Sequence, residues 1–114
     1  MQTLHSNDCL PCERIYKLLE AETIDFLLKR LGSNWHLSQD KKQLVKQFYF
    51  ENPYQILAFI NAIGWMTHFK DHPPILEMNG TDCLVCYTTS KINGLSEYDF
   101  LCANKVEYLF EKMK

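Results

Sequence analysis

The order of apolar and polar residues predicts a chain that alternates helices and short strands. Four apolar residues recur at the three- and four-residue spacing of one helical face: Ile24, Leu27, Leu28 and Leu31. Gly32 follows where helices commonly end, so we expect a first helix over residues 20–31. Residues 34–37 form a candidate short strand. Residues 44–50 are rich in β-branched and aromatic side chains, which favours a second strand.

A second helix is expected from Asn52-Pro53, because Asn is a good N-cap and Pro needs no N–H at the first helical position. Apolar residues then form one stripe at helical spacing: Ile56, Phe59, Ile60, Ile63 and Met66. Pro73 and Pro74 end this helix, since proline cannot continue the hydrogen-bond ladder.

A hairpin follows. Residues 75–78 and 81–90 read as strands, and Asn79-Gly80 between them favours a type I′ turn with both residues at positive φ. The return strand carries apolar residues on both faces. This pattern predicts a central strand covered on both sides, in part by a partner subunit.

The last helix is expected to begin after Ser96, with Asp99 three residues later in a pattern resembling a capping box. The residues it is expected to bury are Cys102, Ala103, Val106, Leu109, Phe110 and Met113. The element order is α-β-β-α-β-β-α. Two hairpins favour a four-stranded antiparallel sheet with helices packed on one face, an α+β fold.

Composition limits the number of domains, the cellular location and the classes of partner that we expect. The chain has 114 residues, enough for one domain, which we place at residues 20–114 after a polar lead-in over residues 1–19. A net charge of −2 gives no basic surface for nucleic acid. The apolar run at residues 56–66 is too short to cross a bilayer, and the N-terminus has no apolar signal. We therefore expect a cytoplasmic protein that binds neither nucleic acid nor membrane.

The five cysteines fit reduced thiols better than a disulfide framework. Cys9-x-x-Cys12 and Cys83-x-x-Cys86 together resemble a zinc-ribbon ligand set. However, Cys83 and Cys86 lie an odd number of residues apart on a predicted strand, so they point to opposite faces. We expect Cys83, Cys86 and Cys102 to be small buried hydrophobes. Cys9 and Cys12 remain candidates for a two-ligand metal or redox site.

Five short segments, taken together and in register, resemble the pterin-4a-carbinolamine dehydratase family. They are Trp35, Lys46-Gln47-Phe48-Tyr49-Phe50, Asp71-His72-Pro73-Pro74, Thr89-Ser90 and Gly94-Leu95-Ser96-Glu97-Tyr98-Asp99. The resemblance implies the same four-stranded fold. It also implies a hydro-lyase reaction, loss of water from 4a-hydroxytetrahydrobiopterin to give quinonoid dihydrobiopterin, with no metal or organic cofactor.

The same resemblance implies partners. Family members form homodimers or homotetramers by joining sheet edges, and they serve aromatic amino-acid hydroxylases, whose pterin leaves as the carbinolamine. The expected partners of this chain are therefore its pterin substrate, further copies of itself and a hydroxylase.

The resemblance also places the site residues. Family members carry Asp-His-His-Pro and Thr-His. The first histidine falls on His72, the second on Pro73 and the third on Ser90, while a family acidic residue falls on His68. Dehydration delivers a proton to the departing hydroxyl and removes one from N5, and histidine suits both transfers. An alternative alignment sets Asp71-His72-Pro73 on His-His-Pro and also leaves one motif histidine.

The candidate catalytic residues are thus His72, His68 and Asp99, and the candidate substrate-binding residues are Asp71, Pro73, Thr89, Ser90 and Trp35. For several of these residues a purely structural role is an alternative explanation. His68, four residues before His72 on the expected helix, either replaces a lost histidine or is a solvated residue favoured by the helix dipole. His72 and Asp99 suit helix caps, and Trp35 suits the core.

Three functions stay open at this stage. The first is a slow, divergent dehydratase acting through His72. The second is a non-catalytic pterin-binding or dimerisation module of the same fold, which would tolerate the loss of two histidines. The third is a thiol or metal protein that uses Cys9 and Cys12.

Overall fold

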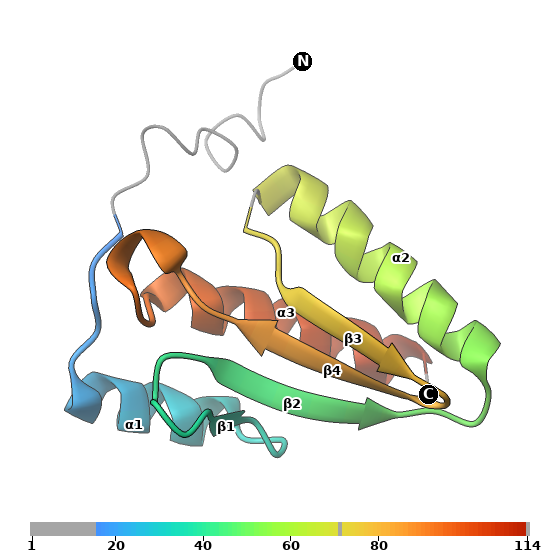
Figure 1. Ribbon diagram of the computed structural model, residues 1–114, viewed down its shortest axis with the longest axis horizontal. Helices are drawn as coiled ribbons and strands as arrows, with labels where there is room; N and C mark the ends of the chain where they lie inside the picture. Colours follow the sequence, from blue (N-terminus) through green and yellow to red (C-terminus); the bar gives the residue numbers. More distant parts are fainter. Residues whose placement is uncertain (1–15, 71, 114) are drawn as a thin grey trace.

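A single open sheet organises the computed structural model, which describes residues 16–70 and 72–113. The four strands are β1 (His36–Leu37), β2 (Leu44–Tyr49), β3 (Ile75–Asn79) and β4 (Asp82–Tyr87). They are ordered β1-β2-β4-β3, and every neighbouring pair is antiparallel (Figure 1). The return strand of the hairpin, β4, is therefore a central strand as predicted.

Three helices pack on one face of this sheet. They are α1 (Ala21–Leu31), α2 (Pro53–Lys70) and α3 (Glu97–Met113), and a short 3₁₀ turn, η3 (Ser90–Ile92), links β4 to α3. Helix α3 contacts both α1 and α2 and lies behind the strands in Figure 1. The predicted α+β fold is confirmed.

Two predicted helix ends are confirmed by their hydrogen bonds. The backbone N–H of Gln55 donates to Oδ1 of Asn52 at 3.0 Å, so Asn52 caps the N-terminus of α2. Gly32, with φ of 59°, ends α1 and donates its N–H to the carbonyl oxygen of Leu28 at 2.9 Å. These ends are local features, so the sequence alone could place them.

The hairpin turn differs from the prediction by one residue. Asn79 pairs with Asp82 inside the ladder, so Gly80 and Thr81 form the two-residue loop. Only Gly80 has positive φ, at 63°, which is the pattern of a type II′ turn with glycine first. The pairing of the two strands therefore fixed the turn type, and Asn79 keeps an extended conformation.

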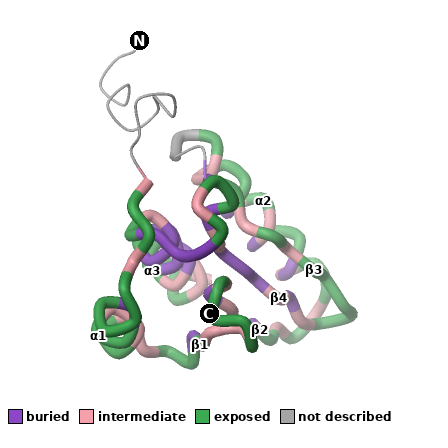
Figure 2. Tube along the Cα trace, turned by 60° about the vertical axis from the view of Figure 1, so that its left-hand side comes forward, coloured by how far each residue is buried: buried purple, intermediate pink, exposed green. Residues whose placement is uncertain are grey.

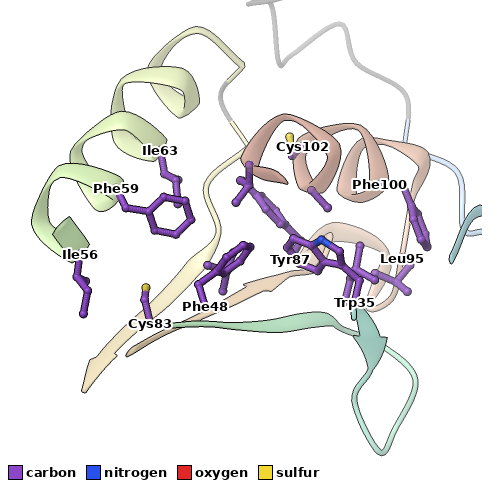
Figure 3. Close-up of a cluster of buried hydrophobic side chains, with 14 of the residues drawn as sticks. Trp35, Phe48, Ile56, Phe59, Ile63, Cys83, Tyr87, Leu95, Phe100 and Cys102 are labelled. Atoms are coloured by element: carbon purple, nitrogen blue, oxygen red, sulfur yellow. The ribbon is translucent and has the colours of Figure 1, made fainter. Parts of the chain in front are cut away.

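The core lies between the inner face of the sheet and the helices. Phe48 of β2 is its centre, with ring centroids 5.0 Å from Phe59 of α2 and 4.9 Å from Phe110 of α3. Figure 3 shows buried side chains from β2, β4, α2 and α3 gathered between the sheet and the helices. Strand β4 is the most buried strand and runs as a purple band through Figure 2. No helix covers the outer face of the sheet in the described part of the chain.

The cysteines of β4 lie on opposite faces of the sheet, as the strand periodicity predicts. Cys83 belongs to the core, whereas Cys86 is paired across the sheet with Val45 and Ile75 on the outer face. Burial raises the pKa of the Cys83 thiol to about 11, so it stays protonated at neutral pH. Cys9 and Cys12 lie outside the described residues.

A network of polar side chains lies at the edge of the core. The Lys46 ammonium lies 2.8 Å from Oε1 of Glu107, and the indole N–H of Trp35 donates to the same oxygen at 2.9 Å. Lys46 and Trp35 are 8% and 5% exposed. The network joins β2, α3 and the segment before β1, so it ties the sheet to its covering helix.

No helix in residues 16–70 or 72–113 is long and apolar enough to cross a membrane.

Replacing Asn52 with Ala should lower the free energy of unfolding by about 1 kcal/mol, because the Gln55 N–H loses its capping acceptor. Urea unfolding measures the change. The control is Asn61→Ala in the exposed middle of the same helix, where alanine is the better helix former and no loss is expected. Equal losses in both variants would show that capping is not responsible.

Glu107→Gln should destabilise the fold by about 2 kcal/mol, because the nearly buried Lys46 ammonium loses its counter-charge while Trp35 keeps an acceptor oxygen. Adding Lys46→Met to the same chain should restore most of the loss, since no unpaired charge remains. Thermal and urea unfolding compare the two variants. A double variant less stable than Glu107→Gln would contradict this account.

Candidate functional site

His72 lies just beyond α2, in the segment that leads to β3. It is only 7% exposed, and its Nε2 lies 2.6 Å from Oδ1 of Asp99, which is fully buried at the start of α3. With Asp99 ionised, its oxygens can only accept, so His72 donates its Nε2 proton. This choice of tautomer leaves Nδ1 of the neutral ring with a lone pair.

Asp99 is held by two further hydrogen bonds at its other oxygen. Oδ2 accepts the hydroxyl of Thr89 at 2.8 Å and the backbone N–H of Ser96 at 2.9 Å. Because the single Thr89 hydroxyl proton goes to the carboxylate, Ser96 donates its hydroxyl to Thr89 at 2.7 Å. The carboxylate is therefore hydrogen-bonded both to the segment that follows β4 and to the start of α3.

The capping box predicted at Ser96 and Asp99 is half formed. The Asp99 carboxylate caps the Ser96 N–H, but the Ser96 hydroxyl bonds Thr89, and the N–H of Asp99 donates to the backbone oxygen of Ser96 at 3.1 Å. Asp99 thus serves both the helix terminus and His72.

Two aromatic rings lie beside the imidazole. Tyr87, at the end of β4, lies nearly parallel to His72, with ring centroids 6.0 Å apart and an angle of 10°. Tyr16 lies 6.1 Å away at 31°. Tyr87 is fully buried, its hydroxyl has no hydrogen-bond partner in the described residues, and burial raises its pKa. The phenol therefore stays neutral and acts on His72 through its ring.

A pocket opens beside His72. Its volume is about 190 Å³, and the described residues that line it are Tyr16, His72, Pro73, Thr88, Thr89, Ser90 and Lys91. Drug-sized ligands generally occupy about 300 to 1,000 Å³, so this pocket suits a small ligand. No described residue hydrogen-bonds Nδ1 of His72, and His72 is one of the lining residues of the pocket.

The structure brings together five of the sequence-predicted site residues. His72, Pro73, Thr89 and Ser90 line the pocket, and Asp99 lies directly behind His72. Asp71 lies outside the described residues. The interpretation of Trp35 as a pocket wall is not supported by its position, because Trp35 is a core residue bound to Glu107.

The expected pairing of His68 with His72 on one helical face is wrong. Helix α2 ends at Lys70, so the four-residue helical spacing does not extend to His72. His68 is exposed and stacks on Trp65, with ring centroids 5.7 Å apart and an angle of 11°, and it is not among the lining residues.

Sequence reasoning missed Tyr16, Tyr87 and Lys91. Tyr87 could have been found, because strand alternation places it on the inner face beside Thr89 in the motif. Tyr16 precedes any recognisable motif. It reaches the pocket because the N–H of Leu19 donates to the backbone oxygen of Leu95 at 3.0 Å, which draws the N-terminal segment across the loop.

The arrangement is a histidine–carboxylate pair at the base of a small, partly polar pocket. A neutral imidazole with one nitrogen bound to a buried carboxylate is a suitable general base, because the carboxylate stabilises the imidazolium that forms. Within residues 16–70 and 72–113, no group of three or more His, Cys, Asp or Glu side chains could hold a metal ion.

Comparison with known proteins finds a matching family model and near full-length relatives. Residues 17–109 match the family model described as pterin 4 alpha carbinolamine dehydratase. A protein from Nitrosomonas europaea, provisionally named pterin-4-alpha-carbinolamine dehydratase, is 44% identical over 95% of this chain and 94% of its own. A relative from Legionella pneumophila with the same provisional name is 38% identical over 93% and 94%.

Two solved structures share the fold. A transcriptional coactivator/pterin dehydratase from Brucella melitensis superposes with a TM-score of 0.77 at 19% identity, covering 82% of this chain and 98% of that one. A pterin dehydratase-like protein described as a RuBisCO assembly factor in the alpha-carboxysome gives 0.59 at 19% identity, covering 69% and 92%. At such identities these two show the fold alone. The family model and the near full-length relatives go further: this chain belongs to the pterin 4 alpha carbinolamine dehydratase family.

Proposed function

We propose that the protein removes water from 4a-hydroxytetrahydrobiopterin to give quinonoid dihydrobiopterin, with His72 as its general base. The observation that carries the proposal is the 2.6 Å hydrogen bond between His72 and the buried Asp99, at the base of the pocket. Family membership supports the reaction class.

In the proposed reaction, Nδ1 of His72 takes the proton from N5 of the pterin. The electron pair of the N5–H bond forms the N5=C4a double bond, and the C4a–O bond breaks with its pair on oxygen. The leaving hydroxide takes a proton from water, and the imidazolium returns its proton to solvent. Asp99 stabilises the imidazolium while it exists.

The expected rate acceleration is limited because the motif positions carry one histidine instead of three. Pro73 has no donor, and the Ser90 hydroxyl can hydrogen-bond the leaving group but cannot transfer protons readily near neutral pH. The protein then supplies one of the two proton transfers, and water supplies the other. General base catalysis at a single position contributes about 10²- to 10⁴-fold.

The decisive assay forms the carbinolamine with an aromatic amino-acid hydroxylase and follows its dehydration with and without this protein. Acceleration supports the proposal. Pterin binding without acceleration at high protein concentration would contradict it and favour the non-catalytic binding module of the same fold.

His72→Gln should remove most of the acceleration, about 10²-fold or more, because glutamine cannot accept the N5 proton. The matched control is His68→Gln, which changes an exposed histidine outside the pocket and should keep the wild-type rate. The same hydroxylase-coupled assay measures both. If His68→Gln lost activity and His72→Gln kept it, the assignment of the base would be overturned.

Asp99→Asn should preserve the fold and lower kcat by about 10²-fold or more. Thr89 and the Ser96 N–H both donate to one oxygen, so the asparagine carbonyl must face them and its NH₂ must face Nε2 of His72. That donor forces the proton onto Nδ1 and removes the basic lone pair. Nitrogen-15 NMR of the imidazole measures the tautomer, and an unchanged tautomer with full activity would refute the role of Asp99.

A further inference from the structure

The rim of the pocket carries a lysine that the dehydration chemistry does not use. Lys91 lies in η3 and is one of the lining residues. Its backbone is fixed by a short closed loop, in which Thr89 and Gly94 form a bridge and the N–H of Asn93 donates to the oxygen of Ser90 at 3.1 Å. Because Thr89 also holds Asp99, the position of Lys91 is fixed relative to His72.

Tyr16 positions the Lys91 side chain. The ammonium lies over the Tyr16 ring, 5.5 Å from its centroid, and the ring is itself held edge-on against Tyr98 with centroids 5.4 Å apart. A cation–π contact of this kind favours one placement of a flexible side chain. The charge is thereby directed to the mouth of the pocket before any ligand arrives, which lowers the ordering cost of binding.

The charges around the pocket are unbalanced. Its described lining contains one cation, Lys91, and no carboxylate, while Asp99 is sealed behind His72 with no exposed surface. Lys46, the nearly buried lysine, is paired with Glu107, whereas no described carboxylate pairs with Lys91. An exposed, pre-positioned ammonium that has no carboxylate partner in the described part of the chain, at the mouth of a small pocket, is suited to an anionic group on the ligand.

We propose that Lys91, held by Tyr16, selects pterins whose side chain carries a carboxylate or phosphate over pterins with a neutral side chain. This inference rests on the proposed function and ranks the pterins that enter that pocket: 4a-hydroxytetrahydrobiopterin, whose side chain is neutral, is turned over there but binds more weakly than a pterin with an anionic side chain. The chemistry at N5 and C4a is the same for either class. Lys91 therefore acts on ligand affinity, and His72 acts on turnover.

The test measures binding of two matched probes, pterin-6-carboxylate and 6-hydroxymethylpterin, by fluorescence titration of the intact chain. We expect about fivefold tighter binding of the carboxylate, the size of one partly exposed ion pair, and a smaller ratio at high salt. Lys91→Gln should bring the ratio close to one without changing the affinity for the neutral probe. Lys91→Arg should keep the preference, and so should Lys105→Gln, which removes an exposed lysine outside the lining.

The outcomes separate this inference from the proposed function. Equal affinities of the wild-type chain for the two probes, or a preference that survives in Lys91→Gln, would overturn the role of Lys91 and leave the dehydratase proposal intact. Failure of both probes to bind would overturn the role of Lys91, while the dehydration assay decides the dehydratase proposal separately. A preference lost in Lys91→Gln and kept in Lys91→Arg supports the inference.

Discussion

The buried carboxylate of Asp99 is the interaction on which the site depends. It accepts hydrogen bonds from His72, Thr89 and Ser96, and so joins the segment after α2, the end of β4 and the first turn of α3. A buried carboxylate is tolerated only when its oxygens are satisfied, so these three groups have little freedom to move apart. The same constraint that closes the fold at this corner also sets the tautomer and direction of the imidazole.

This dual use explains how the motif frame can be present in a chain that, by the expected alignment, carries a histidine at only one of three motif positions. Thr89, Ser96 and Asp99 are needed for the start of α3 whether or not the pocket turns over substrate, and Pro73 and Ser90 still form its wall. Retention of the frame is therefore evidence for fold and pocket position. The case for catalysis rests on one residue, His72. Its Nε2 is hydrogen-bonded to Asp99, and its Nδ1 is directed away from the carboxylate.

The residues around the pocket have different roles. Tyr87 and Tyr16 lie beside the imidazole, the hydroxyl-bearing Thr88, Thr89 and Ser90 line one side, and Lys91 supplies the only formal charge in the described lining. The Lys46–Glu107–Trp35 network lies in the core and serves stability instead. Two lysines that both contact aromatic rings therefore differ in role, because Lys46 has a carboxylate partner and Lys91 has none among residues 16–70 and 72–113.

Local signals in the sequence determined the helices, their caps, the central hairpin and the α+β class, because apolar spacing and capping chemistry act over a few residues. The sequence also determined which motif residues could meet, including His72 and Asp99. Only the tertiary structure decided that His68 lies outside the pocket, that Trp35 belongs to the core, and that Tyr16 and Lys91 line the same pocket as His72. These placements depend on where α2 stops and how the N-terminal segment crosses the Leu95 loop. Both are set by packing and hydrogen bonds between residues far apart in the chain, which no local pattern encodes.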